Sequence, residues 1–595
     1  MNYESTLGVC VFPKTIRNQP DCSSHRQYIF EILEHAGLTF SHIQPETLAE
    51  SLRQLQLLVT VGDAQLDEDA AQAMRDWVQR GGAWLSLGSV CNLGDVHGVD
   101  YVSSAGYCDK SFAYQHSTLG EGYLRRSQPH PVLDSRNIHL HYYNGIIVKV
   151  RSAQAQILAS TLDAHGRESD FPALVESTFG EGRTLFLAPD AVGAVVRISH
   201  GTAVTADGIS APDGSAPLND NMLKCDDGQV LDWHFDRTEV PGVPGVKGFF
   251  EPVADQWREI ILRSIFYLAA KVEMNLSLVW LYPRNLPALA HLSHDTDSND
   301  PVLGERMLEE VNNAEIHTTW CVIKEATIGY PKWLIEKIKN SGHELATHYN
   351  AVNFPWSEEE FAQQYRELAE IFGEDPVSNK SHYTRWEGGT GFFDWCRRQN
   401  IELDQTKGPS KLGEVGFNFG TAQLYFPLAD NGEIHTVLEQ TLHTQDLLIT
   451  APPEIIPLLL RAVHRHHGVL HALFHPAHIA KNGVAKSLQN MIQQAKDLGL
   501  EWFTARQLND WERARRNVNL RCDQEHAIAP KVLLTAGTRL DDATILILGN
   551  HAAVEINGEM YPSQLCCRWG MQFSAVTLNI EITRERVEEK YFSFT

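Results

Sequence analysis

Hydrophobic and polar positions follow two different periods along the first part of the chain. LQLLVTVGD (55–63) and AWLSLGS (83–89) are apolar runs with the length of buried strands. Between them, EDAAQAMRDWVQRGG (68–82) has the periodicity of an amphipathic helix. This strand–helix–strand order predicts a parallel sheet with helices on both faces. We therefore expect residues 1–275 to form an α/β domain.

The same part of the chain contains an insertion with little periodicity. FGEGRTLFLAPDAVG (179–193) predicts a hairpin turn that leads into a further strand. The segment 200–246 is rich in Gly, Pro and Asp, so we expect a long loop there. After it, residues 251–272 predict a helix, and its apolar stripe consists of Trp257, Ile261, Ile265 and Ala269.

Strand and helix patterns repeat on a longer scale in residues 276–518. RMLEEVNNAEIHTTWCVI (306–323) and PKWLIEKIKNSGHELATHYN (331–350) each combine a helix with a strand. A further helix is expected between a capping box at Ser357 and Glu360 and a stop at Gly373. Its predicted buried stripe consists of Phe361, Tyr365, Leu368 and Ile371. Repeated β–α units predict a barrel, in which the chemistry lies at the carboxyl ends of the strands.

The last part of the chain, 519–595, contains short β-like runs. Asn557-Gly558 is a hairpin signal between two of them. We expect a small β-sandwich here. A chain of 595 residues is too long for one hydrophobic core. The sequence therefore predicts three domains, 1–275, 276–518 and 519–595.

Charge and composition restrict the kind of partner. Asp and Glu number 75 against 50 Lys and Arg, which gives a formal net charge of −25. Nucleic acids and anionic membranes require a basic surface, so neither is expected as a partner. The N-terminus has no basic, apolar signal pattern and no stretch is long enough to span a membrane. The ten cysteines include no CxxC pair, and we expect reduced thiols in a cytoplasmic protein.

Ionisable side chains gather where strands of the predicted barrel end. LAHLSHDTDSND (289–300) places Asp295 and Asp297 two residues apart, on the same side of an extended strand. Two adjacent carboxylates repel each other unless a cation lies between them. The later strand ends contain further histidines: His343, His348, His382, His471, His475 and His478. Imidazole and carboxylate together suit a divalent ion such as zinc, with an open position for water.

The motifs SHDTD, GHELATHYN, SHYTRW and LFHPAH, in this order, resemble the NodB-homology polysaccharide deacetylase superfamily over about 285–510. The resemblance implies a deformed (β/α) barrel and one divalent metal ion held by an Asp-His-His set. Zinc is expected, with cobalt, nickel and manganese as alternatives. Many members have a second ligand histidine four residues after the first, where this chain has Val352. SHYTRW resembles a divergent branch, which implies Asp297, His348 and His382 as ligands.

Each of these residues also has a structural interpretation. The position of His343 is typical of a residue that supports a strand, although His343 stays an alternative third ligand. His294 suits a packing residue. His464, His466 and His467 suit the end of a helix, where imidazolium is favourable against the helix dipole.

The N-terminal pattern resembles the class I glutamine-amidotransferase-like fold, which implies a flavodoxin-like parallel sheet. Active members have a nucleophilic cysteine in a Gly-x-Cys-x-Gly elbow. Here LGSVCNLG has Val90 at that place and Cys91 one residue later. We therefore expect an inert thiol and a non-catalytic domain that serves as a scaffold or as a homo-oligomer surface.

These observations predict a metal-dependent hydrolase of C–N amide bonds that removes an acyl group from an amino sugar or glycan. Asp295 is the expected general base and His475 the expected proton donor. Arg385 is expected to anchor Asp295 or a substrate carboxylate, and Trp386 or Trp356 to stack on a sugar ring. The alternatives are an amidohydrolase for a small metabolite and a non-catalytic carbohydrate-binding or assembly protein, which Val352 favours.

Overall fold

The computed structural model describes residues 6–12, 23–105, 121–133, 139–216, 221–325, 329–524 and 529–583. The chain divides into two compact units. Unit 1 comprises Met1–Val196, Gln256–Asn285 and Arg513–Thr595. Unit 2 comprises Arg197–Asp255 and Leu286–Glu512. The protein is of mixed α/β class, as predicted, while independent folding of the three predicted segments stays a prediction.

Unit 1 contains a large mixed sheet with the strand order β2-β1-β3-β4-β11-β10-β9-β6-β7. The parallel part consists of β2 (Ser41–Ile43), β1 (Leu7–Val11), β3 (Leu57–Val61), β4 (Ala83–Leu87) and β11 (Gly182–Leu187). The remaining strands are antiparallel: β10 (Glu168–Phe179), β9 (Gln156–Asp163), β6 (Glu121–Arg126) and β7 (His139–Tyr143). The predicted parallel, flavodoxin-like sheet is therefore wrong for the strands β10, β9, β6 and β7.

The predicted helices and the predicted hairpin of unit 1 are present. Helix α4 (Glu68–Gln79) begins at Asp67, whose side chain accepts a hydrogen bond from the Ala70 N–H. Strands β10 and β11 pair across a tight turn, with Phe179 opposite Gly182. The predicted apolar stripe lies in α7 (Val253–Lys271), and Trp257, Ile261, Ile265 and Ala269 are all fully buried.

Two small sheets of unit 1 contain most of the predicted C-terminal strands. One has the order β14-β26-β30-β29 and the other β24-β25-β27-β28. The first consists of β14 (Ser277–Val279), β26 (Leu540–Leu548), β30 (Met571–Ile580) and β29 (Gln564–Arg568). The second consists of β24 (Val518–Cys522), β25 (Lys531–Ala536), β27 (Ala553–Ile556) and β28 (Glu559–Pro562). Asn557 and Gly558, both with positive φ, form the predicted hairpin turn.

Unit 2 is built on a parallel sheet with the order β20-β19-β18-β17-β16-β15-β22-β21. The strands are β15 (Leu289–Asp295), β16 (Thr319–Ile323), β17 (Glu344–Tyr349), β18 (Ser378–Ser381), β19 (Leu403–Asp404), β20 (Leu438–Glu439), β21 (Thr444–Gln445) and β22 (Val469–Leu473). A short strand, β23 (Glu501–Trp502), also pairs with β15. The prediction was a deformed (β/α) barrel. Among the described residues β20 and β21 are not paired with each other, so the parallel sheet forms a half-barrel.

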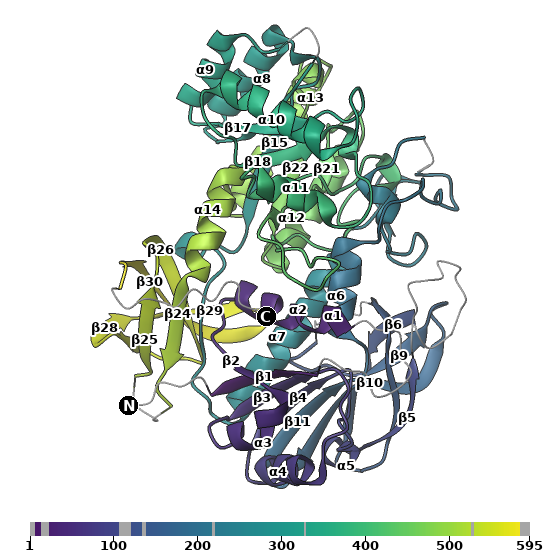
Figure 1. Cartoon of the computed structure of the whole chain (residues 1–595), viewed down its shortest axis with the longest axis vertical. Helices are drawn as coiled ribbons and strands as arrows, with labels where there is room; N and C mark the ends of the chain where they lie inside the picture. The colour runs from purple at the N-terminus through teal and green to yellow at the C-terminus, as the bar shows by residue number, and fades with distance from the viewer. Residues whose placement is uncertain are drawn as a thin grey trace. The chain divides into compact units, whose positions relative to one another are not determined.

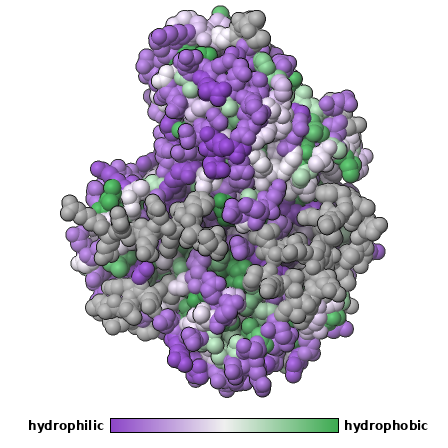
Figure 2. Space-filling view, in the orientation of Figure 1, coloured by the Kyte–Doolittle hydropathy of each residue, from purple (hydrophilic) through white to green (hydrophobic). Residues whose placement is uncertain are grey.

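Helices cover the strands of unit 2, as the sequence predicts (Figure 1). They include α8 (Pro301–Asn313), α9 (Lys332–Asn340), α10 (Glu358–Phe372), α11 (Gly391–Arg398), α12 (Ile456–Arg465) and α13 (Val484–Asp497). Around α8 and α9 the face drawn in Figure 2 is mostly hydrophilic. No described helix is both long enough and apolar enough to cross a membrane.

Helix α10 begins and ends where predicted, but one predicted core position is wrong. The Ser357 hydroxyl accepts a hydrogen bond from the Glu360 N–H, and Gly373 ends the helix with a positive φ. Phe361, Tyr365 and Leu368 are buried, whereas Ile371 is 46% exposed. Phe372 is buried instead, because it lies four residues after Leu368 and continues the same helical face.

Candidate metal centre

The carboxyl ends of neighbouring parallel strands bring the predicted ligands to one edge of the unit 2 sheet. Asp297 follows β15 in a short 3₁₀ turn, Asp297–Asn299. His348 lies in β17, and His382 opens the turn His382–Thr384 directly after β18. Because all these strands run in the same direction, their ends meet at the same edge.

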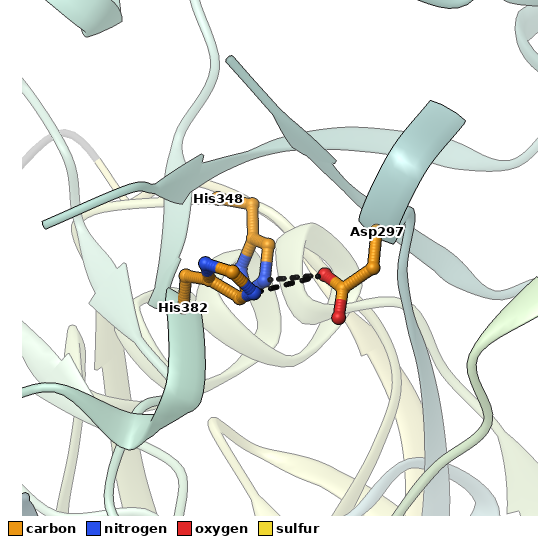
Figure 3. A group of neighbouring side chains, drawn as sticks. All are labelled: Asp297, His348 and His382. Atoms are coloured by element: carbon orange, nitrogen blue, oxygen red, sulfur yellow. Dashed lines mark ion pairs between the residues drawn. The ribbon is translucent and has the colours of Figure 1, made fainter. Parts of the chain in front are cut away.

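Asp297, His348 and His382 point toward one another (Figure 3). Oδ1 of Asp297 lies 3.5 Å from Nε2 of His348 and 3.4 Å from Nε2 of His382. Ligand atoms at zinc-type bond lengths in a tetrahedral site are separated by about 3.3 Å, so these spacings suit a zinc-like ion. Asp297 Oδ1 and His348 Nε2 are also buried without a hydrogen-bond partner. A bound cation would satisfy both atoms, so the residues fit a metal ion.

The surroundings of the three candidate ligands favour the protonation states that a metal requires. The backbone carbonyl of Lys380 lies 2.9 Å from Nδ1 of His348 and accepts its proton, which leaves the Nε2 lone pair directed at Asp297. Burial alone would raise the pKa of Asp297. The imidazoles of His348, His382 and His475 beside it outweigh burial and hold that pKa well below its usual range. The carboxylate is therefore ionised.

Asp295 lies beside this group, at the end of β15. Its Oδ2 is 3.7 Å from Nε2 of His348, and its Oδ1 is buried without a hydrogen-bond partner. Asp295 and Asp297 do not face the same side through strand alternation alone, because the 3₁₀ turn carries Asp297 out of the extended strand. Both carboxylates nevertheless approach the same imidazole nitrogen.

Lys380 is a site residue that the sequence analysis missed. Its side chain is only 1% exposed, and Nζ lies 3.6 Å from Oδ2 of Asp295. Nζ also donates a hydrogen bond to the Ser293 hydroxyl at 3.4 Å. The sequence could have indicated this residue, because Lys380 is the one charged residue of the strand SNKS and lies two residues before His382.

His475 approaches the same centre from the end of β22. Its Nε2 lies 3.6 Å from Oδ2 of Asp297, and its Nδ1 is hydrogen-bonded to the Asp446 carboxylate. Burial alone would lower the pKa of His475, but the Asp446 carboxylate raises it to about 9. Asp446 is fully buried and was also missed, because it follows the two-residue strand β21 in a region without periodicity.

Asp446, His475 and His478 form a second group that could hold a metal ion. Nδ1 of His478 lies 3.1 Å from the Asp446 Oδ2 atom that His475 also contacts. The Nδ1 atom of His475 is already hydrogen-bonded to this carboxylate, which leaves no room for an ion between them. The first group therefore fits a metal ion better.

The three predicted substrate-binding residues differ in their contacts and in their exposure to solvent. Arg385 donates to the Leu223 carbonyl at 2.9 Å and pairs with Glu387, and no described ion pair joins it to Asp295. Trp386 is 2% exposed and offers no free face for a sugar. The ring of Trp356 is only partly buried, so the predicted stacking role stays open for it alone.

The contacts of the other histidines agree with structural roles. His343 lies apart from the ligand group: its Nδ1 accepts from the Thr318 N–H at 3.0 Å and its Nε2 lies 3.0 Å from Asn312 Oδ1. His294 is buried against Trp320, with ring centroids 4.7 Å apart. His466 and His467 follow α12, as expected for a helix end.

Cys91 in unit 1 has the properties of an inert thiol. It is fully buried, and burial raises its pKa to about 12. Its closest polar neighbours are Ser89, whose hydroxyl accepts from the Cys91 N–H, and Asp63, which accepts from Ser89. The glutamine-amidotransferase-like identity of this part of the chain stays a prediction.

The chain has weak similarity to several solved structures, and neither a family model nor a curated protein matches it. A proposed polysaccharide deacetylase from Mycobacterium smegmatis is 16% identical over 40% of this chain and 93% of that chain, with a TM-score of 0.31. A second one, from Bordetella bronchiseptica, is 16% identical over 36% and 83%, with a TM-score of 0.24. A β-galactosidase from Bacillus circulans sp. alkalophilus is 13% identical over 32% of this chain and only 30% of its own length, with a TM-score of 0.25. Similarities at this level support no conclusion about activity.

Proposed function

We propose that the protein is a metal-dependent hydrolase of C–N amide bonds that removes the acyl group from an amino sugar or a related glycan. One observation supports this most strongly. Asp297, His348 and His382 converge with the spacing of metal ligands, and two of their facing atoms are buried without a hydrogen-bond partner. A buried polar atom without a partner is costly, so its presence favours a ligand that the protein binds.

A divalent ion held by these three residues lowers the pKa of water and polarises a carbonyl group. The residues of the chain supply the proton transfers. Asp295 accepts a proton from the water that attacks the amide carbon. His475 donates its Nε2 proton to the amine nitrogen as the C–N bond breaks, so the products are a carboxylate and a free amine.

Two further residues position the acid and the base. Asp446 accepts from Nδ1 of His475, which keeps the proton of Nε2 directed toward the centre. Lys380 places a buried cation beside the base Asp295. The ammonium group, 3.6 Å from Oδ2 of Asp295, holds this carboxylate in place beside the centre.

Two alternatives remain to be separated by experiment. The first is a non-catalytic carbohydrate-binding or assembly protein, which Val352 favours because a common ligand position lacks histidine. The position of His382 beside Asp297 weakens this alternative, because it supplies a third ligand from another strand. The second is an amidohydrolase for a small metabolite, which uses the same site.

Elemental analysis of the purified protein, after incubation with zinc, cobalt, nickel and manganese, tests the proposal. We expect one ion per chain. The metal-loaded protein should release acetate from N-acetylated amino sugars, and a parallel panel of small linear and cyclic amides identifies the metabolite alternative. No bound metal, or bound metal without hydrolysis of any amide, would overturn the proposal.

A further inference from the structure

An exposed aromatic ring lies beside one of the candidate ligands. Tyr383 directly follows His382 and is 55% exposed. Its ring meets the His382 imidazole edge-on, with the centroids 4.6 Å apart. Trp386 and Phe392 of this region are buried in a hydrophobic cluster, and Trp356 and Trp395 are partly buried against it. Tyr383 therefore differs from its neighbours by presenting its ring to solvent at the metal centre.

The backbone at this position is strained. Tyr383 has φ 58° and ψ 26°, and Thr384 has φ 51°. Residues other than glycine rarely adopt this left-handed backbone conformation, and β-branched residues such as Thr do so least of all. Two consecutive residues in this conformation persist only where the surrounding contacts enforce it, and such strain concentrates at functional sites.

The contacts that hold the turn come from the insertion of unit 2. Lys224 and Arg385 form an isolated antiparallel bridge, and the Leu223 carbonyl accepts from the Trp386 N–H at 3.2 Å. The same carbonyl accepts from the Arg385 guanidinium at 2.9 Å. The Arg385 N–H closes the turn on the His382 carbonyl at 3.1 Å. These backbone and guanidinium contacts are made by the residues after Tyr383. Lys224 Nζ also lies 5.7 Å from the centroid of the Tyr383 ring, and the residue stays 55% exposed.

We propose that the ring of Tyr383 is the platform on which the sugar ring of the substrate stacks. The inference rests on the proposed function and deepens it by assigning a residue to recognition of the pyranose ring. A pyranose presents an apolar C–H face, and an aromatic side chain buries such a face at little cost in conformational entropy. Because Tyr383 adjoins His382, a sugar stacked on it has its acylamino group next to the metal centre.

Binding measurements on the full-length chain test this platform. Isothermal titration calorimetry with chitotriose, and with other N-acetylated hexosamine oligosaccharides, is performed in an Asp295→Asn background to prevent turnover. Tyr383→Phe should keep the Kd within about 2-fold because the ring stays. Tyr383→Gly should raise the Kd about 10-fold, which corresponds to about 1.4 kcal/mol.

Tyr383→Gly separates loss of the ring from damage to the fold. Glycine adopts a positive φ without strain, so this variant should melt at the same temperature as its parent or above it, with the same metal content. Trp333→Ala is the matched control, because Trp333 is an exposed aromatic on α9 and should leave the Kd unchanged.

The proposal of a stacking platform is wrong if Tyr383→Gly binds these sugars as tightly as its parent, or if the parent binds none of them. It is also overturned if Tyr383→Phe weakens binding as much as Tyr383→Gly. Failure of the proposed function is a different result: the metal-loaded wild type then hydrolyses no amide, while sugar binding that depends on the Tyr383 ring still supports the platform.

Discussion

At the scale of single residues, two carboxylates two positions apart have different surroundings. Asp297 Oδ1 faces two imidazoles at 3.4 and 3.5 Å, whereas Asp295 is paired with Lys380 and lies at the side of His348. A ligand must neutralise the cation, whereas a base needs only to reach the water beside it. Substitution of each residue is therefore expected to have a different effect on metal binding and on the rate of hydrolysis.

Asp297→Asn should lose the metal and the activity together, because a charged ligand is removed. Asp295→Asn should retain metal near the wild-type level while the rate falls about 10²- to 10⁴-fold, the usual effect of losing a general base. Elemental analysis and steady-state kinetics on both variants provide the comparison. If Asp295→Asn empties the site and Asp297→Asn does not, the two roles are exchanged.

Lys380→Met should lower kcat at least about 10-fold with unchanged metal content, because a charge 3.6 Å from Asp295 is removed from a buried position. Lys324→Met is a suitable control, since Lys324 pairs with Glu367 at a part-exposed position. A rate equal to that of the wild type would show that Asp295 needs no neighbouring cation.

Sequence reasoning predicted three residues that the fold brings together, but it missed the residues that contact the neighbouring Asp295 and His475. Asp297 and His348 stand next to recognisable strands, so their place at the sheet edge follows from strand direction. Asp446 reaches His475 only through the tertiary fold, because the two residues are 29 positions apart in the chain. Arg385, predicted to anchor Asp295 or a substrate carboxylate, donates a hydrogen bond to the Leu223 carbonyl of the insertion, and no local pattern reveals this contact.

At the scale of elements, length decides what a pattern can predict. Helix α10 and strand β15 are long enough to show periodicity, and both were expected from it. Strands β19, β20 and β21 have two residues each, too few to show alternation, so the half-barrel was not predictable. The antiparallel half of the unit 1 sheet was missed because strand direction depends on the connections and not on the strands.

The insertion is joined to the half-barrel by a buried pair of acids. Asp226 and Glu414 are both fully buried, and Ser410 donates to each of them, through its hydroxyl at 2.9 Å and its N–H at 3.2 Å. Burial, and then the neighbouring Asp226, raise the pKa of Glu414 well above its usual range. When folding raises the pKa of an acid, the folded state loses stability as the pH rises above the pKa that the acid has in the unfolded chain.

Glu414→Gln should therefore become progressively more stable, relative to wild type, as the pH rises from 5 to 9. Each pH unit between the two pKa values of Glu414 contributes about 1.4 kcal/mol, equivalent to about 2–4 °C in Tm. Thermal melts at several pH values measure the difference. Glu370→Gln, on the exposed side of α10, should show a constant difference, and a constant difference for Glu414→Gln as well would contradict the prediction.

At the scale of the whole molecule, the chain crosses between the two units at four places. One crossing, 285/286, directly follows the 3₁₀ turn Pro283–Asn285, and the other three lie inside helices. The divisions at 196/197, 255/256 and 512/513 fall within α6 (Ala191–His200), α7 and α14 (Ala505–Arg516). Domain boundaries are ordinarily sought in polar, flexible linkers. A boundary within a continuous helix has no such signal, so sequence patterns do not reveal these three divisions.

Cys91→Ser should leave the amide hydrolysis of the full chain unchanged, and neither protein should hydrolyse glutamine. The thiol is fully buried and its pKa is raised to about 12, so it is not the thiolate that nucleophilic catalysis needs. Glutaminase activity in the wild type that disappears in Cys91→Ser would overturn this prediction.

Two compact units should produce separable melting transitions, and the metal should act on one of them. An ion that binds only the folded state, supplied at 100 times its Kd, stabilises that state by about 2.7 kcal/mol. This should raise the Tm of unit 2 by about 5–10 °C and leave that of unit 1 in place. Differential scanning calorimetry with and without zinc measures both. His382→Ala should abolish the shift, whereas His343→Ala, whose imidazole braces Thr318, should lower the Tm and keep the shift. The opposite pattern would make His343 the third ligand, and a shift of both transitions would show that the units unfold together.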